Sequence, residues 1–193
     1  MKKLVTTLFL AVALVVPALA EKPDMELIPK IGYLFSPELT NDGKSSSEDS
    51  AISIGADFFI NVQDNLFVGG GLMWGENTKF NKYIDNEKIG FTNLYAAAKY
   101  KFLVNGSENN PFYIYPLAQL GLAVPGWQYD GPTIDYEISE GLYWGLGAGI
   151  EIANIIAEFI YGCDYATRKG DGVKDEDFSY TAFRINVGYK FNL

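Results

Sequence analysis

The feature that most restricts what this chain can fold into is the strict alternation of residues 178–193. Beyond Thr181 every second residue is apolar, and the residues between them are small, amide-bearing or charged. A period of two places alternate side chains on opposite faces of a β-strand. The segment therefore predicts a strand with an apolar face (Phe183, Ile185, Val187, Tyr189, Phe191, Leu193) and a polar face (Ala182, Arg184, Asn186, Gly188, Lys190, Asn192).

The same alternation recurs along the chain between clusters of turn-forming residues. Long connections follow the first, third, fifth and seventh runs, and shorter ones, including Asn105-Gly106 and Ala153-Asn154, follow the others. This pattern predicts an all-β fold, an eight-stranded antiparallel up-and-down β-barrel with its long loops at one end. The expected strands are 27–35, 51–60, 66–75, 89–102, 112–123, 141–152, 155–165 and 178–193.

The two faces of these strands predict that the barrel is transmembrane. In hydrocarbon every backbone polar group needs an internal partner, so a spanning sheet closes on itself and turns its apolar face outward. A lipocalin-like soluble barrel would have the opposite polarity. Each run is also long enough to cross a bilayer when tilted. Aromatic residues near the short turns predict an interfacial girdle: Phe58, Phe67, Tyr100, Phe102, Phe112, Tyr189 and Phe191.

The N-terminus has the organisation of a secretory signal. Met1, Lys2 and Lys3 precede the apolar run 4–16, and 17–20 ends in a small-x-small pattern. A membrane helix is the alternative, but the run is shorter than the ~20 residues a span requires. We expect residues 1–20 to be cleaved and 21–193 to form the barrel domain.

Composition excludes several classes of function. The net charge is −9, which argues against nucleic acid as a partner. The chain has no histidine, so histidine-based nucleophile pairs and zinc sites cannot form. Its one cysteine, Cys163, excludes an internal disulfide and is expected on the lipid side. We therefore predict no catalytic residues, no metal site and no cofactor.

Charged residues recur at inward positions of the expected strands. Opposite charges in a narrow lumen are expected to pair, because isolated buried charges are strongly unfavourable. One interpretation is an ion-guiding constriction or a proton relay, and the other is a structural plug, favoured because ~8 strands enclose only enough room for side chains. The expected network is Lys30, Asp57, Lys99, Lys101, Glu151, Glu158 and Arg184, with Lys99 or Lys101 and Arg184 facing Asp57, Glu151 and Glu158; Asp164 is also inward.

The final residues carry a recognisable pattern. The last eight residues read polar-x-Gly-x-x-apolar-x and then a final residue. Asn186 is the polar residue, Gly188 the glycine, Phe191 the apolar residue, and Leu193 ends the chain. With the alternation, this resembles the small eight-stranded outer-membrane β-barrel proteins of Gram-negative bacteria, the porin-like and opacity-type proteins. That family usually ends in Phe or Trp, and Leu193 departs from it. The resemblance implies an outer-membrane location and recognition of these residues by the outer-membrane assembly machinery.

The loops are the remaining place for function. The expected loops 38–49, 76–87, 124–140 and 167–177 are acidic overall, which suits either divalent cations bridging to lipopolysaccharide or simple solvation. We expect a monomeric, non-enzymatic protein with a structural or surface-interaction role. Its partners would be outer-membrane lipid, lipopolysaccharide and a host or cell-surface ligand. Trp127 and Tyr129 suit either a contact with such a ligand or packing over the barrel mouth. A narrow porin-like channel for small solutes is the alternative.

Overall fold

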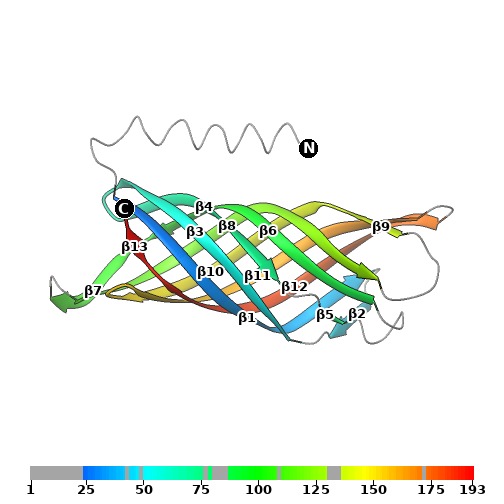
Figure 1. The fold of residues 1–193 in the computed structure, drawn as a ribbon, viewed down its shortest axis with the longest axis horizontal. Helices are drawn as coiled ribbons and strands as arrows, with labels where there is room; N and C mark the ends of the chain where they lie inside the picture. Colours follow the sequence, from blue (N-terminus) through cyan, green and yellow to red (C-terminus); the bar gives the residue numbers. More distant parts are fainter. Residues whose placement is uncertain are drawn as a thin grey trace.

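The computed structural model is a barrel of tilted antiparallel strands (Figure 1). It describes residues 24–41, 44–47, 50–75, 78–79, 87–107, 110–129, 136–170 and 173–193. The predicted signal segment 1–20 lies outside these residues. Within them, no helix is long and apolar enough to cross a membrane.

Eight long strands form the barrel wall, and short strands extend several of them. The predicted fold class is confirmed. The wall consists of β1 (Met25–Asn41), β3 (Ala51–Gln63), β4 (Leu66–Gly75), β6 (Glu87–Tyr100), β8 (Asn110–Tyr129), β10 (Gly141–Ile152), β11 (Ile155–Gly170) and β12 (Val173–Tyr189). The short strands are β2 (Lys44–Ser47), β5 (Thr78–Lys79), β7 (Phe102–Ser107), β9 (Tyr136–Ser139) and β13 (Phe191–Asn192).

The first and last wall strands close the barrel. β1 pairs with β12 from Lys30 opposite Gly188 up to Asn41 opposite Phe178. β13 continues this seam, with Leu27 opposite Phe191. Closure leaves every wall strand with two neighbours, so the wall has no open edge.

The two faces of the wall have opposite character, as the alternation predicts. In β10, Tyr143 and Glu151 point inward and are buried, whereas Leu146 and Ile150 are exposed on the outside. Leu146 is 59% exposed, a value typical of a surface side chain, although it is a leucine. The outer surface is thus apolar and the interior mixes polar, charged and aromatic side chains.

The two ends of the barrel differ. One, the terminal end, carries the tight turns Asp64-Asn65 and Ala153-Asn154, where Asp64 and Ala153 adopt φ of 45° and 54°. The C-terminus joins this end, because the Leu193 amide donates to the Met25 carbonyl oxygen at 2.9 Å. The opposite end, the loop end, carries β2, β5 and β9 (Figure 1).

Much of what the sequence predicts as loop is strand in the structure. Glu38 to Asn41 pair with both Thr181–Phe178 and β2, and the 124–129 part of β8 pairs with β6. β9 pairs with the last residues of β11. Strand pairing continues beyond the apolar part of the wall, because the hydrogen bonds of a ladder are made by the main chain. Where water surrounds both faces of the sheet, the side chains do not have to be apolar.

Two local predictions are wrong. Asn105-Gly106 is not the turn: Gly106 lies opposite Pro111 within the β7–β8 ladder. Phe67 is not a girdle residue, because its parity places it in the lumen, where it is buried. Cys163 has the predicted outward parity, and it is 2% exposed between its register partners Trp144 and Thr181.

A charged network in the lumen as the candidate functional site

The inward charged residues form the most concentrated polar group of the described chain. Alternation points them all to one side of the wall, and the closed barrel then brings them together. All are buried: Lys30, Lys99, Lys101, Arg184 and Lys190 balance Glu26, Asp57, Glu151, Glu158 and Asp164. They fall into a ring near the terminal end, a triad in the middle, and a polar layer toward the loop end.

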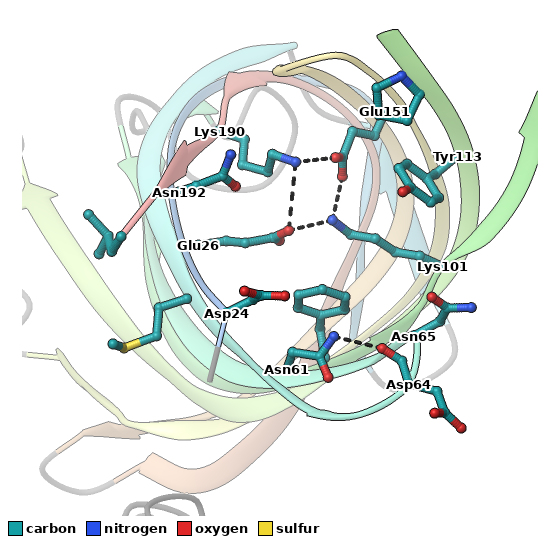
Figure 2. A pocket seen from close by; sticks show the side chains of 14 residues that line it. Asp24, Glu26, Asn61, Asp64, Asn65, Lys101, Tyr113, Glu151, Lys190 and Asn192 are labelled. Carbon is teal, nitrogen blue, oxygen red and sulfur yellow. Dashed lines mark hydrogen bonds and ion pairs between the residues drawn. The ribbon is translucent and has the colours of Figure 1, made fainter. Parts of the chain in front are cut away.

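The terminal-end ring consists of Glu26, Lys101, Glu151 and Lys190 (Figure 2). Lys101 contacts Glu26 and lies 2.6 Å from Glu151, Lys190 lies 2.5 Å from Glu151, and Lys190 lies 3.9 Å from Glu26. Each charge of the ring therefore has an opposite charge on both sides.

Lys99 adds a third lysine to this ring. Its ammonium group lies 2.8 Å from Glu26 and 4.2 Å from the centre of the Phe59 ring. Lys101 similarly lies 4.4 Å from the Phe67 ring. Aromatic faces stabilise such desolvated ammonium groups by cation–π attraction, which explains why Phe67 is inside the barrel.

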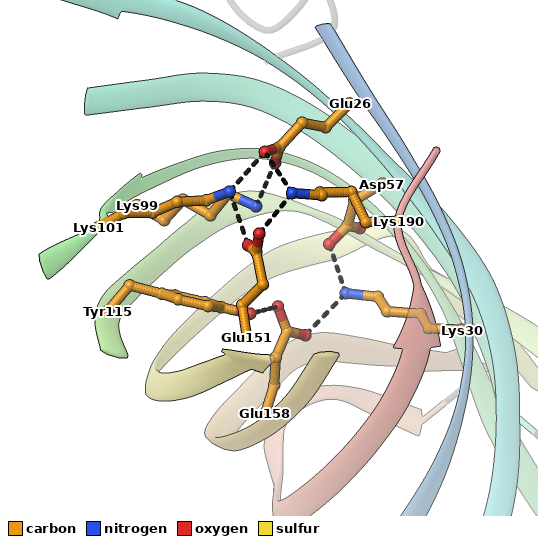
Figure 3. A network of polar contacts seen from close by, with 9 residues as sticks. All are labelled: Glu26, Lys30, Asp57, Lys99, Lys101, Tyr115, Glu151, Glu158 and Lys190. Carbon is orange, nitrogen blue, oxygen red and sulfur yellow. Dashed lines mark hydrogen bonds and ion pairs between the residues drawn. The ribbon is translucent and has the colours of Figure 1, made fainter. Parts of the chain in front are cut away.

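The middle triad consists of Lys30, Asp57 and Glu158 (Figure 3). The Lys30 ammonium lies 2.5 Å from Asp57 and 3.2 Å from Glu158. Tyr95 donates to Asp57 at 2.6 Å and Tyr115 donates to Glu158 at 3.2 Å. Each carboxylate is thus met by a cation and a phenol, as a buried charge requires.

Two glycines make these phenol contacts possible. Gly71 lies in register between Asp57 and Tyr95, and a Cβ there would sit 2.1 Å from Asp57 Oδ1. Gly149 lies between Tyr115 and Glu158, and its Cβ would sit 2.3 Å from the Tyr115 ring. Because a glycine has no side chain on the lumen face of the strand between the two partners, the tyrosine side chain reaches across that strand to its carboxylate.

Sequence reasoning missed Glu26 and Lys190. Both have inward parity. Extending the first strand by one residue would have identified Glu26, and Lys190, already placed on the polar face of the last strand, had only to be included in the expected network. The structure also differs from the expectation for Arg184. It lies opposite Leu34 and Ile160, closer to the loop end than the triad, and interacts electrostatically with Asp164. The ion pairs of Asp57, Glu151 and Glu158 are made with lysines.

A hollow of about 460 Å³ leads to the ring from the terminal end (Figure 2). Glu26, Lys101, Glu151 and Lys190 line it together with Asp24, Asp64, Tyr113 and Leu193. Water and small solutes therefore have access to the ring from this side.

The residues of the C-terminal pattern occupy both faces of the closing seam. Asn186 donates to Glu158 at 3.2 Å, and Gly188 lies opposite Lys30. Phe191 and Leu193 point outward and are exposed. The polar residue and the glycine of the pattern thus face the lumen, and its apolar residues lie on the outer surface of the barrel.

A closed, up-and-down barrel with an apolar exterior and a polar interior is the architecture of a transmembrane β-barrel. Residues 6–191 match the outer membrane protein beta-barrel domain family. The chain belongs to this family, and it is an outer-membrane protein.

Solved structures share the fold at low sequence identity. Neisserial surface protein A matches with TM-score 0.50 and 15% identity over 84% of this chain and 96% of that one. AlkL in lipid bilayers matches with TM-score 0.57 and 12% identity over 89% and 92%. Ail of Yersinia pestis matches with TM-score 0.49 and 14% identity over 88% and 100%. None of the curated proteins compared with the chain matches it.

Proposed function

We propose that this protein is a non-enzymatic outer-membrane barrel whose lumen is closed by paired charges and whose loop end makes surface contacts. The observation that carries the proposal is the ring of Glu26, Lys101, Glu151 and Lys190, which places alternating charges across the lumen. Opening a path through it requires breaking buried ion pairs, which is strongly unfavourable.

Planar-bilayer conductance of the refolded protein tests this closure. We expect no stable single-channel steps from the wild type. Simultaneous Lys101→Ala and Glu151→Ala substitutions remove one side of the ring while keeping the charge balance, and this variant should also give no steps, because the ion pairs of Lys30 with Asp57 and Glu158 still cross the lumen. Asp175→Asn, at an exposed position of β12, is the control and should stay silent. Stable steps from the wild type would contradict the closed lumen.

A narrow porin-like channel is the alternative, favoured by the hollow of about 460 Å³ that reaches the ring from one end. In that function the ring would act as a selectivity filter rather than a plug. Its signature would be wild-type conductance whose cation-to-anion preference changes when Glu151 is replaced by Gln.

For the surface role, we propose that the acidic loop end contacts lipopolysaccharide, with divalent cations bridging acids to phosphates, and a ligand on a host or another cell. Exposed acids at this end, including Glu38, Asp175 and Asp177, support it. The thermal midpoint of monomeric barrel in lipopolysaccharide vesicles should exceed that in phosphatidylcholine, and EDTA should remove the difference. An increase insensitive to EDTA would argue against cation bridging.

A further inference from the structure

Asn105 is followed directly by Gly106, and this is the only Asn-Gly pair of the sequence. In such a pair the backbone nitrogen of the glycine can attack the side-chain carbonyl carbon of the asparagine and close a five-membered ring. The attack is easiest where the following residue has no Cβ to hinder it, where the main chain is weakly restrained, and where water reaches the site. The end of the β7–β8 hairpin combines these conditions.

The backbone nitrogen of Gly106 lies against the side chain of the residue before it. It donates a hydrogen bond to Asn105 Oδ1 at 2.8 Å. Because Oδ1 is bonded to Cγ within one planar amide group, the same nitrogen also lies close to Cγ. Reacting atoms that are held near one another gain the rate advantage of an intramolecular reaction. The hydrogen bond thus places the nucleophile beside the carbon that it attacks.

The β7–β8 ladder restrains the main chain at Gly106 only weakly. Gly106 adopts a φ of 142°, a conformation that is open to glycine and strained for other residues. Its register partner is Pro111, which has no amide hydrogen and cannot donate to it. The register of the ladder also shifts between Leu103 and Asn105. The peptide bond between Asn105 and Gly106 is therefore not fixed by regular strand pairing.

This segment lies at the terminal end of the barrel, where it is open to water. Both Asn105 and Gly106 are exposed. The Pro111 carbonyl oxygen accepts a hydrogen bond from the Ala153 amide at 3.1 Å, which places this part of the hairpin beside a tight turn of the terminal end. β7 projects from the same end of the barrel (Figure 1). Water is therefore available to hydrolyse a ring formed at Asn105.

Asn154 provides a contrast at the same end of the barrel. It is followed by Ile155, whose β-branched side chain crowds the backbone nitrogen that would have to attack. The Asn154 side chain donates through Nδ2 to the Tyr189 hydroxyl at 3.4 Å. We therefore expect Asn154 to keep its amide under conditions in which Asn105 reacts.

We propose that Asn105 is a site of spontaneous isoaspartate formation in the folded barrel. The Gly106 nitrogen forms a bond to Asn105 Cγ, its proton passes to the side-chain nitrogen, and that nitrogen leaves as ammonia. One water molecule then opens the succinimide, at Cγ to give aspartate or at the main-chain carbonyl carbon to give isoaspartate. The reaction needs no oxidant, enzyme or cofactor. Isoaspartate adds one carbon to the main chain of β7 and a carboxylate to the terminal end.

Peptide mass spectrometry of the refolded barrel tests this proposal. The protein is incubated in micelles in mildly alkaline buffer made with water labelled with heavy oxygen, and it is digested afterwards in ordinary water. The Asn105 peptide should progressively convert to labelled isoaspartate and aspartate forms, which chromatography separates, whereas the Asn154 peptide should stay unchanged. Conversion should be faster at higher pH, because the attacking nitrogen must lose its proton. An Asn105 peptide that stays as unmodified as the Asn154 peptide would overturn the proposal, as would labelled aspartate without isoaspartate.

Asn105→Gln is the matched variant. It keeps the amide group but lengthens the side chain by one methylene, so the five-membered ring cannot form and the peptide should stay unmodified. Modification of this variant at the wild-type rate would contradict attack by Gly106. Wild-type chain unfolded in guanidinium chloride shows the effect of the fold, and the folded barrel should convert at a comparable rate. Conversion of the unfolded chain alone would show that the ladder protects Asn105, and the proposal would be wrong.

Discussion

Tyr95 donates a 2.6 Å hydrogen bond to Asp57 across the bare backbone of Gly71. The two partners are on strands that are not neighbours, because Gly71 on β4 lies between them in register. Gly149 plays the same part between Tyr115 and Glu158. The interior polar network therefore depends on which wall positions lack a side chain as much as on which positions carry charge.

Adding a methyl group at these glycines should destabilise the barrel. In Gly71→Ala and Gly149→Ala the new Cβ would overlap Asp57 or Tyr115, and overpacking of this kind costs about 1–3 kcal/mol. Gly162→Ala is the milder comparison, because its Cβ would meet Tyr143 at 3.3 Å rather than a neighbour at 2.1 to 2.3 Å. Urea unfolding in micelles measures the difference. Equal midpoints for the three variants would show that the phenol contacts do not need the glycines.

Removing one member of the terminal-end ring should cost more than removing a balanced pair. Glu151→Gln leaves Lys101 and Lys190 without their shared carboxylate, and breaking a buried pair costs about 3–5 kcal/mol. Adding Lys190→Gln should recover part of the lost stability, because it removes one of the two lysine charges that lost this carboxylate. A double-mutant cycle from urea midpoints measures this coupling. Additive losses would mean that the two residues do not act as one network.

Arg184→Ala should lower the heat stability of the folded barrel. The substitution leaves the buried Asp164 without the cation that interacts with it, and an uncompensated buried charge is strongly destabilising. Gel electrophoresis after stepwise heating measures the temperature at which the compact form is lost. Asp164→Asn in the same chain should restore part of that temperature. Unchanged melting of Arg184→Ala would argue that this charge has no structural role.

Deleting 191–193 should reduce assembly in the outer membrane. The deletion removes the Leu27–Phe191 pairing, the hydrogen bond from Leu193 to Met25 and the apolar end that the family resemblance assigns to assembly. An equal deletion within the expected loop, of 131–133, is the control. Membrane fractionation with heated and unheated gel samples gives the folded fraction. Equal folded fractions for the two deletions would contradict an assembly role for these residues.

The sequence by itself determined the fold class and the side of the wall on which each charge lies. Both follow from a period of two, which is a local property: Lys30, Asp57 and Glu158 are inward because of their neighbours in the chain. It also predicted the tight turn at Ala153-Asn154, where the pattern reverses without a gap.

Only the tertiary structure decided which charges pair. Lys30 and Glu158 are 128 residues apart, and they meet because barrel closure sets β1 beside β12, which pairs on its other side with β11, the strand that carries Glu158. That register sends Arg184 to the loop-side layer and brings Glu26 and Lys190 into the ring with Lys101. The tertiary structure also extends the strands beyond the apolar part of the wall. There the side chains no longer alternate in polarity, so the sequence does not indicate a strand. The face of the wall on which a side chain lies is encoded by the local sequence. Which charged side chains pair depends on the shear of the closed sheet, and no single segment specifies that shear.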